Sequence, residues 1–334
     1  MVKILIVKLG AIGDVLRTTS LLPGLSDKFN RQARIDWLTA PSAKDILLNN
    51  PYISRLATWE ERAELDDYQL VVGLEDDRAA CEYVSSRRAE QIVGAYLKNG
   101  KLTYTPSGWF DMSMISRFGL EQANVLKKKN QNTYQQHMAA LLGIEISPYV
   151  FNLKPEEREY GEQVIRELGI GKRETIIGIN TGAGKRWPLK SWGVEQTIDL
   201  VKRLRKELGL VSLILGGDQE QERNALIAKE TDMPNAGSHS LRGFASVIDQ
   251  GRILLSSDSL AMHFGIALKK RLVVFFGPTS AAEIELYGLG EKLLAPIDCS
   301  VCYKKDCAKS PNCMVLLSVD EVFQAIKRQA SEGL

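Results

Sequence analysis

The sequence predicts an α/β protein made of two consecutive α/β domains. Two observations lead to this fold class: short apolar runs typical of buried strands alternate with helix-like amphipathic segments, and the alternation is interrupted once near the middle of the chain. A length of 334 residues agrees with two domains, because a domain commonly takes about 150 residues. We therefore expect two parallel sheets covered by helices, with functional residues in the loops that follow the strands.

In the first half, the pattern predicts a helix over residues 14–29 and strands at 3–7, 34–38 and 69–73. A proline-bounded extended stretch at residues 146–155 is the best linker candidate, since prolines disfavour continued helix. This places the two domains at residues 1–155 and 156–334. The C-terminal helix is expected to pack either on its own domain or back on the first.

In the second half, the same alternation begins again. Helices are predicted at 156–168, 191–208, 219–230 and 260–268, and strands at 175–180, 211–215, 253–257 and 271–276. Two α/β units in tandem imply a cleft between them, and ligands of such sheets bind beyond the carboxyl ends of the strands.

The composition is that of a folded globular protein, with 44% hydrophobic and 25% charged residues. Basic and acidic residues number 43 and 41 and balance in both halves, which argues against a nucleic-acid partner. No apolar run approaches the length of about 18 residues that spans a bilayer, and the apolar start is too short for a signal peptide. Five cysteines, an odd number, fit a reducing compartment. We expect a cytoplasmic protein.

The loop after the first strand contains Gly10, Gly13 and Asp14. The glycines let the backbone turn sharply close to a ligand, and the following helix N-terminus carries partial positive charge. Asp14 is either the N-cap of this helix or a catalytic carboxylate. The spacing lacks the three-glycine fingerprint of a dinucleotide-binding dehydrogenase.

The loop after the strand at 175–180 suits a diphosphate. Thr181 and Gly182 allow close approach of backbone N–H groups, and Lys185 supplies charge, although the same residues also fit a solvated basic turn. The loop is not a P-loop, because Arg186 stands where that motif needs Ser or Thr.

Two further strand-end loops carry polar groups. Asp258 or Ser259 is expected to cap the next helix, on which His263 is either a ligand-binding or a structural histidine. Gly277, Pro278 and Thr279 are expected to lead into a helix whose N-terminal N–H groups bind phosphate. Together the loops indicate a phosphorylated ligand and a reacting hydroxyl.

Several of these stretches, taken in order along the chain, resemble glycosyltransferase family 9, the ADP-heptose:lipopolysaccharide heptosyltransferases. The similar segments are residues 4–22 (ILIVKLGAIGDVLRTTSLL), 178–192 (GINTGAGKRWPLKSW), 216–222 (GGDQEQE), 257–267 (SDSLAMHFGIA), 274–280 (VFFGPTS) and the cysteine-rich 299–314. The resemblance implies a GT-B fold, in which two Rossmann-like domains face each other across a cleft. The first would bind the acceptor and the second the nucleotide sugar.

The resemblance also implies a reaction: inverting transfer of heptose from ADP-heptose, a substrate, to the lipopolysaccharide inner core, with no cofactor and no metal in the chemistry. The alternatives are a nucleotide-sugar epimerase of the same fold, a family member using another sugar nucleotide, and a non-enzymatic regulator that binds nucleotide sugars.

The site residues follow from the same resemblance. Asp14 matches the general base, and Lys185 is expected to meet the growing charge of the diphosphate. Candidates for the acceptor are Gly13, Arg17 and Thr18, and those for the donor are Thr181, Gly182, Lys185, Glu220, Asp258, His263, Gly277, Pro278 and Thr279. Glu222 lies close enough to replace Glu220 as the ribose ligand. Ser259 departs from the Thr-Gly of many members, which affects the donor-sugar assignment more than the base.

Four cysteines, Cys299, Cys302, Cys307 and Cys313, form a cluster in the sequence. They are either thiolate ligands of a metal or reduced thiols, and we favour thiols because the spacing lacks a second CxxC pair. Cys81 stands apart and is expected in the core.

Aromatic residues Trp109 and Phe110 precede a cationic run at 127–129. This pattern fits either peripheral contact with the inner face of the inner membrane, where a lipid-linked or core-oligosaccharide acceptor would lie, or a helix packed on the first domain with a solvated basic end.

Overall fold

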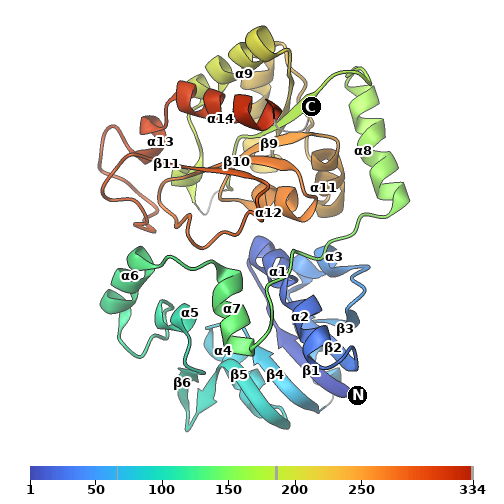
Figure 1. Ribbon diagram of the computed structural model, residues 1–334, viewed down its shortest axis with the longest axis vertical. Coiled ribbons are helices and arrows are strands. Elements are labelled where there is room, and N and C mark those ends of the chain that lie inside the picture. The colour runs from blue at the N-terminus through green and yellow to red at the C-terminus, as the bar shows by residue number, and fades with distance from the viewer. Residues whose placement is uncertain (66, 185–186, 332–334) are drawn as a thin grey trace. The chain divides into compact units, whose positions relative to one another are not determined.

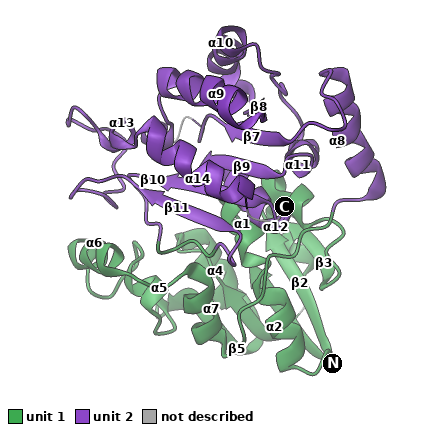
Figure 2. Cartoon of the chain, turned by 45° about the horizontal axis from the view of Figure 1, so that its top comes forward, with its two compact units in different colours: residues 1–152, 282–285 green, residues 153–281, 286–334 purple. Residues whose placement is uncertain are grey.

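The computed structural model describes residues 1–65, 67–184 and 187–331. The chain divides into two compact units, shown in green and purple in Figure 2. Unit 1 contains Met1–Asn152 and Ala282–Glu285, and unit 2 contains Leu153–Ala281 and Leu286–Leu334. Each unit has its own sheet with helices packed on it (Figure 1), so the α/β class is confirmed.

Unit 1 is built on a six-stranded sheet of order β3-β2-β1-β4-β5-β6. All neighbouring strands are parallel except β6, which runs antiparallel to β5. The central strand β1 has four consecutive residues, Ile4 to Val7, fully buried, as expected for a parallel strand covered on both faces. The strands are β1 (Val2–Val7), β2 (Ala33–Thr39), β3 (Ile53–Thr58), β4 (Tyr68–Gly73), β5 (Ala89–Lys98) and β6 (Lys101–Tyr104).

The helices of unit 1 connect and cover these strands. They are α1 (Ile12–Thr18), α2 (Leu21–Lys28), α3 (Lys44–Leu47), α4 (Arg78–Ser86), α5 (Gly108–Asp111), α6 (Leu120–Lys129) and α7 (Tyr134–Leu142), with 3₁₀ helices at Pro41–Ala43 and Trp59–Glu64.

The single helix predicted over residues 14–29 is wrong, because α1 and α2 are separate helices. The side chains of Thr19 and Ser20 donate hydrogen bonds to the carbonyls of Leu16 and Arg17, at 2.6 and 2.7 Å. Hydroxyl groups that take up helical carbonyls in this way compete with the regular backbone pattern. The Thr19 hydroxyl also accepts a hydrogen bond from the Val150 N–H at 2.9 Å. This bond holds the junction of α1 and α2 against residue 150, near the end of the segment Met1–Asn152.

Unit 2 is built on a parallel five-stranded sheet of order β11-β10-β9-β7-β8. Its strands are β7 (Ile176–Asn180), β8 (Val211–Leu215), β9 (Ile253–Ser257), β10 (Arg271–Phe276) and β11 (Gly290–Leu294). Its helices are α8 (Pro155–Glu167), α9 (Val194–Leu208), α10 (Gln221–Thr231), α11 (Leu241–Asp249), α12 (Leu260–Ala267), α13 (Cys313–Leu316) and α14 (Val319–Ser331), with 3₁₀ helices at Pro188–Lys190 and Asp218–Glu220.

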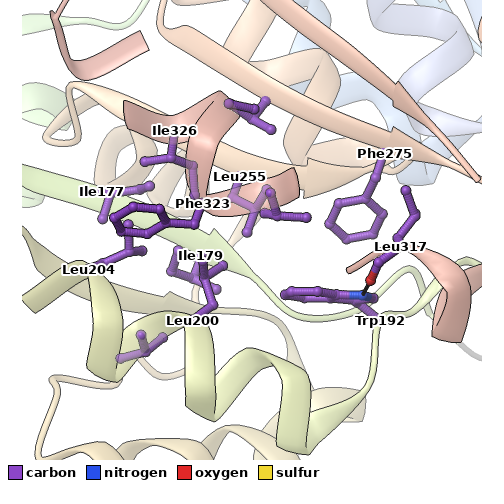
Figure 3. Packing of buried hydrophobic residues seen from close by; sticks show 14 of the residues in the cluster. Ile177, Ile179, Trp192, Leu200, Leu204, Leu255, Phe275, Leu317, Phe323 and Ile326 are labelled. Carbon is purple, nitrogen blue, oxygen red and sulfur yellow. Dashed lines mark hydrogen bonds between the residues drawn. The ribbon is translucent and has the colours of Figure 1, made fainter. Parts of the chain in front are cut away.

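The C-terminal helix packs on its own domain. Figure 3 shows Phe323 and Ile326 of α14 against Ile177 and other apolar side chains of the unit 2 core. In the same core the indole of Trp192 donates a hydrogen bond to the carbonyl of Leu317 at 3.1 Å.

Two expectations for unit 2 need correction. No helix follows Thr279, because residues 277–289 form bends and turns, so this loop cannot bind phosphate with a helix N-terminus. The helix expected from residue 191 begins at Val194. The residues before it form the 3₁₀ turn Pro188–Lys190, and the Trp192 indole is hydrogen-bonded in the core to the Leu317 carbonyl.

Candidate functional site

The strand order of each sheet locates the edge at which a ligand would bind. In unit 1 the order reverses between β1 and β4, and in unit 2 it reverses between β7 and β9. Chains leaving two such adjacent strands go to opposite faces of the sheet and leave a crevice at the carboxyl ends. Asp14 follows β1, Thr181 follows β7 and Asp258 follows β9. The predicted residues thus lie in the loops next to the two switch points.

In unit 1, Glu75 organises the loop between β1 and α1. One of its carboxylate oxygens, Oε1, accepts hydrogen bonds from Lys8 Nζ at 2.8 Å, from the Leu9 N–H at 2.6 Å and from the Gly10 N–H at 3.1 Å. Burial disfavours the charge on Lys8, but Glu75, Asp14 and Tyr134 outweigh it, and the pKa of Lys8 is raised. Sequence reasoning missed Glu75 and Lys8, because the partners are 67 residues apart.

Asp14 lies in the first turn of α1, with Gly13 partly buried beside it. The N-cap of this helix is Ala11, so the capping alternative for Asp14 is wrong. The Asp14 carboxylate lies 3.1 Å from Arg17 Nη2 through Oδ1, and its side chain is 37% exposed. A partly exposed carboxylate whose orientation is fixed by a neighbouring cation has the geometry that a general base requires.

The other two acceptor candidates on α1 are buried. The Arg17 guanidinium lies 4.2 Å from the ring centre of Tyr134 and 5.1 Å from that of Trp109. The Thr18 hydroxyl donates to the Asp14 carbonyl at 2.6 Å and lies 2.7 Å from the Tyr134 hydroxyl. These contacts hold α1 against α7. Tyr134 is a further residue that no local pattern singles out.

In unit 2, the Thr181 loop is held by side chains from two elements, α10 and the end of β7. The Thr181 hydroxyl donates to Asn224 Oδ1 at 2.5 Å, Arg223 Nη1 donates to the Thr181 carbonyl at 2.7 Å, and Asn180 Nδ2 donates to the Gly182 carbonyl at 2.7 Å. Lys185, the predicted diphosphate ligand, lies outside the described residues, as does its neighbour Arg186.

Glu220 packs directly on this loop. Its two carboxylate oxygens accept the N–H groups of Gly184 at 3.3 Å and Gly217 at 3.0 Å. A Cβ atom on Gly182 would lie only 2.3 Å from the Glu220 side chain. The absence of a side chain at Gly182 therefore lets Glu220 pack this closely on the loop. Glu222 is exposed on α10. Glu220 therefore lies next to the glycine loop, while its contact with a ribose stays a prediction.

Asp258 forms an ion pair with Lys190, which sequence reasoning missed. Lys190 Nζ lies 2.7 Å from Asp258 Oδ2 and donates a second hydrogen bond to the Asp258 carbonyl at 3.0 Å. Burial raises the pKa of Asp258, but Lys190, His263 and Thr279 have the opposite effect, and the net pKa is lowered. His263 and Thr279 are both 5% exposed. The structure thus brings three of the predicted donor residues together.

The helix that begins after Asp258 is not capped as expected. Its N-cap is Ser259, but the Ser259 side chain makes no capping bond. Its hydroxyl contacts Ser256 Oγ at 3.0 Å and accepts from Asn180 Nδ2 at 3.2 Å. The Ser259 hydroxyl therefore connects the ends of β9 and β7.

The cysteine segment lies against the Gly277 turn. The carbonyls of Gly277 and Pro278 accept the N–H groups of Val301 and Tyr303, at 3.2 and 2.9 Å. A Cβ on Gly277 would meet Cys313 Sγ at 2.6 Å. Within the described part of the chain, which includes all five cysteines, no three metal-ligating side chains come together. Cys81 is fully buried, as predicted for a core residue.

Of the two alternatives for residues 109–129, the structure shows aromatic residues packed on the first domain and a solvated basic end. Phe110 is buried, and the Trp109 ring packs edge-on against Tyr134 with ring centres 4.9 Å apart. The exposed apolar side chains are instead Met114, Phe118, Leu120 and Val125, which precede or lie on α6. Lys128 and Lys129 at the end of α6 are exposed. We call these six residues the α6 surface. No helix among the described residues has the length and apolar character to cross a membrane.

Comparison with known proteins places the chain in a family. The model of Glycosyltransferase family 9 (heptosyltransferase) matches residues 121–312. Three solved structures are similar along nearly the whole chain. A family 9 glycosyl transferase from Veillonella parvula DSM 2008 has a TM-score of 0.80 at 18% identity and covers 99% of this chain and 98% of its own.

Two E. coli structures agree with this result. ADP-heptose lps heptosyltransferase II has a TM-score of 0.64 at 16% identity, and the heptosyltransferase WaaC, solved with ADP, has 0.62 at 16% identity; each match covers 98% of both chains. No curated protein sequence matches the chain. The structural likeness confirms the predicted GT-B fold.

Proposed function

Because the chain belongs to glycosyltransferase family 9, we propose that this enzyme transfers a heptose from ADP-heptose to a hydroxyl of the lipopolysaccharide inner core. The observation that carries the proposal is the half-exposed Asp14 carboxylate beside the unit 1 switch point. The E. coli matches support the choice of substrates, since one is an ADP-heptose lps heptosyltransferase and another was solved with ADP.

In this mechanism Asp14 removes the proton of the acceptor hydroxyl as its oxygen attacks the anomeric carbon of the donor. An unassisted sugar hydroxyl is too weakly acidic to attack readily, so a positioned carboxylate is needed. The bond to the ADP oxygen breaks on the opposite face of the sugar, and a single displacement inverts the anomeric configuration. Gly13 would let the acceptor approach the first turn of α1.

The departing ADP requires electrostatic stabilisation, because negative charge grows on its diphosphate. The charge of Lys185 is suited to supply it, together with N–H groups of the loop other than those of Thr181 and Gly184, which donate to Leu215 and Glu220. Glu220 holds that loop in place, and Asp258 with its Lys190 partner would contact the donor sugar. We propose that no cofactor takes part and that cationic side chains meet the diphosphate.

The test is a transfer assay with the purified enzyme, ADP-heptose and two acceptors, Kdo-lipid A and a heptosylated core. We expect ADP release coupled to a heptosylated product, and α linkage from a β-configured donor. Transfer from UDP or GDP sugars alone would reject ADP-heptose as the donor. Formation of an isomer from donor without acceptor would show an epimerase instead.

Asp14→Asn should abolish transfer while calorimetry shows unchanged ADP-heptose affinity. Lys185→Ala should weaken both ADP binding and turnover, because it removes the diphosphate cation. Asp27→Asn is the matched control, since this exposed carboxylate on α2 pairs with exposed Arg31. If Asp14→Asn keeps wild-type turnover, Asp14 is not the base.

We also propose that the enzyme works at the cytoplasmic face of the inner membrane, where its lipid-linked acceptor would lie. The α6 surface supports this location, because apolar side chains beside exposed lysines suit an anionic lipid surface.

Sedimentation with vesicles tests this surface. The wild type should bind vesicles containing phosphatidylglycerol more strongly than pure phosphatidylcholine vesicles, and less so at high salt. Phe118→Ser with Leu120→Ser should lose this binding, whereas Leu226→Ser, a control at an exposed leucine of unit 2, should keep it. Equal binding by all three proteins would reject the α6 surface as the membrane contact.

A further inference from the structure

Arg17 is placed differently from a residue that would meet an acceptor. It lies one helical turn after Asp14, so the two side chains share a face of α1, and its Nη2 lies 3.1 Å from Asp14 Oδ1. Only 7% of the residue is exposed. Its guanidinium lies over the rings of Tyr134 and Trp109. Arg17 therefore contacts Asp14 from the buried side of α1, which packs against Tyr134 and Trp109.

The two aromatic rings are themselves held in place. Tyr134 is the first residue of α7, and its N–H donates to the Glu283 carbonyl at 3.0 Å. Because the Thr18 hydroxyl donates its proton to the Asp14 carbonyl, the Tyr134 hydroxyl is the donor in its 2.7 Å bond to Thr18. The ring of Trp109 meets that of Tyr134 at 83°. The contacts form a closed network that includes the backbone and side chain of Asp14.

The electrostatics of the cluster keep Arg17 charged. Burial opposes the charge, but Asp14, Tyr134, Glu283 and Tyr149 outweigh it and the pKa of Arg17 is raised. A planar guanidinium stacked on rings presents its N–H groups in one fixed direction, which a flexible ammonium does not. Lys8 also interacts electrostatically with Asp14, but its Nζ lies 2.8 Å from Glu75 Oε1.

We propose that Arg17 is a positioning residue for the general base: its clamped guanidinium holds Oδ1 of Asp14 and thereby fixes the direction in which the carboxylate meets the acceptor hydroxyl. This inference rests on the proposed function, in which Asp14 is the base. It replaces the acceptor contact that the sequence suggested for Arg17. It also gives Tyr134 and Trp109 a role, since they set the direction of the guanidinium.

The test compares kcat, KM for each substrate and the pH profile in Arg17→Met, Arg17→Lys and Tyr134→Phe. Arg17→Met should lower kcat about 100-fold and leave the KM values of donor and acceptor within about twofold. It should also move the acidic limb of the kcat profile up by about one pH unit, because an adjacent cation favours the ionised carboxylate. Arg17→Lys should restore the acidic limb but only part of kcat. Tyr134→Phe should lower kcat without moving the limb, since it loosens α1 and keeps the charge.

The control is Arg78→Met on α4, where Arg78 and Glu82 form an exposed pair one turn apart with an N–O distance of 2.8 Å. It should leave kcat and the pH profile unchanged. ADP binding and circular dichroism report whether each variant is folded. If Arg17→Met does not fold, the comparison of Arg17→Lys with Tyr134→Phe decides, because only the second keeps the guanidinium.

Three results would overturn the inference. A raised acceptor KM with unchanged kcat in Arg17→Met would return Arg17 to acceptor binding. An unchanged acidic limb in a folded Arg17→Met variant would show that Arg17 has no effect on the ionisation of the base. Full kcat in both Arg17→Lys and Tyr134→Phe would show that the clamp has no function. Failure of the proposed function is separate, since it appears as an active Asp14→Asn whatever the Arg17 variants do.

Discussion

Three largely buried cations each lie against one carboxylate: Lys8 with Glu75, Arg17 with Asp14, and Lys190 with Asp258. A buried charge is costly without an opposite charge, so each pair fixes the position of both members. Sequence reasoning found Asp14 and Asp258 because they directly follow strands. It could not find Lys190 as the partner of Asp258, because the two are 68 residues apart and meet only when β7 and β9 pair.

The first prediction concerns the ion pair of Asp258. The pKa of Asp258 is lowered in the folded protein, so the pair stabilises the fold above the unfolded carboxyl value of about 3.9 and loses its effect as the pH falls through the folded value. Lys190→Met should therefore lower the free energy of unfolding by about 3 kcal/mol at pH 7, because it removes the ion-pair partner of a buried carboxylate. The difference from wild type should shrink below about pH 4.

Urea unfolding at pH 7 and pH 3 measures both values. Arg166→Met is the control, because Arg166 and Glu162 are an exposed pair on α8 and should contribute less than about 1 kcal/mol. A loss in Lys190→Met that is equal at both pH values would mean that packing, not charge, is the cause.

The second prediction concerns Glu220, whose carboxylate accepts N–H groups on both sides of the glycine loop. Glu220→Ala should weaken ADP binding about tenfold, because two backbone N–H groups lose their acceptor and the loop is freed. Glu220→Gln keeps one acceptor oxygen and should lose less. Isothermal titration calorimetry measures the ADP affinity of each variant, and Glu222→Ala is the control at an exposed carboxylate. A larger loss of affinity in Glu222→Ala than in Glu220→Ala would make Glu222 the nucleotide ligand.

At the scale of elements, the sequence predicted strands better than helix ends. The buried strands β1, β7 and β10 were predicted from continuous apolar runs, which parallel sheets produce. The break between α1 and α2 depends on hydroxyl groups bonding to carbonyls three residues earlier, which residue types alone do not show. The turn found in place of the helix after Thr279 has long-range contacts as well, because residues 301 and 303 donate to the carbonyls of Gly277 and Pro278.

The third prediction concerns the packing of α8 on α11. Gly161 is buried on α8, and a Cβ there would lie 2.3 Å from the Ser246 carbonyl oxygen of α11. Gly161→Ala should destabilise unit 2 by about 1–3 kcal/mol, because backbone atoms must move apart to admit a methyl group. Glu162→Ala changes the exposed neighbour and should have little effect. Thermal unfolding measures both, and an unchanged midpoint for Gly161→Ala would show that the two helices separate freely.

At the scale of the whole chain, the two units have the same class of fold but different strand orders. In unit 1, two strands, β2 and β3, lie beyond β1 on the side away from β4. In unit 2, the single strand β8 lies beyond β7 on the side away from β9. Local patterns predict strands but not which strands become neighbours, so the sequence indicated two α/β units and not these orders. In both units the loop after the first strand lies beside the reversal point. Asp14 and Thr181 could be recognised as candidates without this order, because each lies in a loop that follows a predicted strand.

The fourth prediction follows from the separate positions of the two loops. ADP should slow amide hydrogen exchange most at the ends of β7 and β9 in unit 2, because a ligand that binds the native state opposes local opening there. The sheet amides of unit 1 should change less. Mass spectrometry of peptides from residues 177–184 and 254–259, compared with residues 3–9, measures this difference. Equal protection of both sets would contradict a nucleotide site confined to unit 2.

The short segment Ala282–Glu285 belongs to unit 1 although the residues on both sides of it belong to unit 2. It carries the carbonyl that accepts the Tyr134 N–H, and its Ile284 is 3% exposed. Neither half is therefore one uninterrupted piece of polypeptide. A fragment ending at residue 152 would lack these four residues, and dissection or domain-exchange experiments on this enzyme must supply them, either by fusing the segment through a linker or by keeping the chain whole.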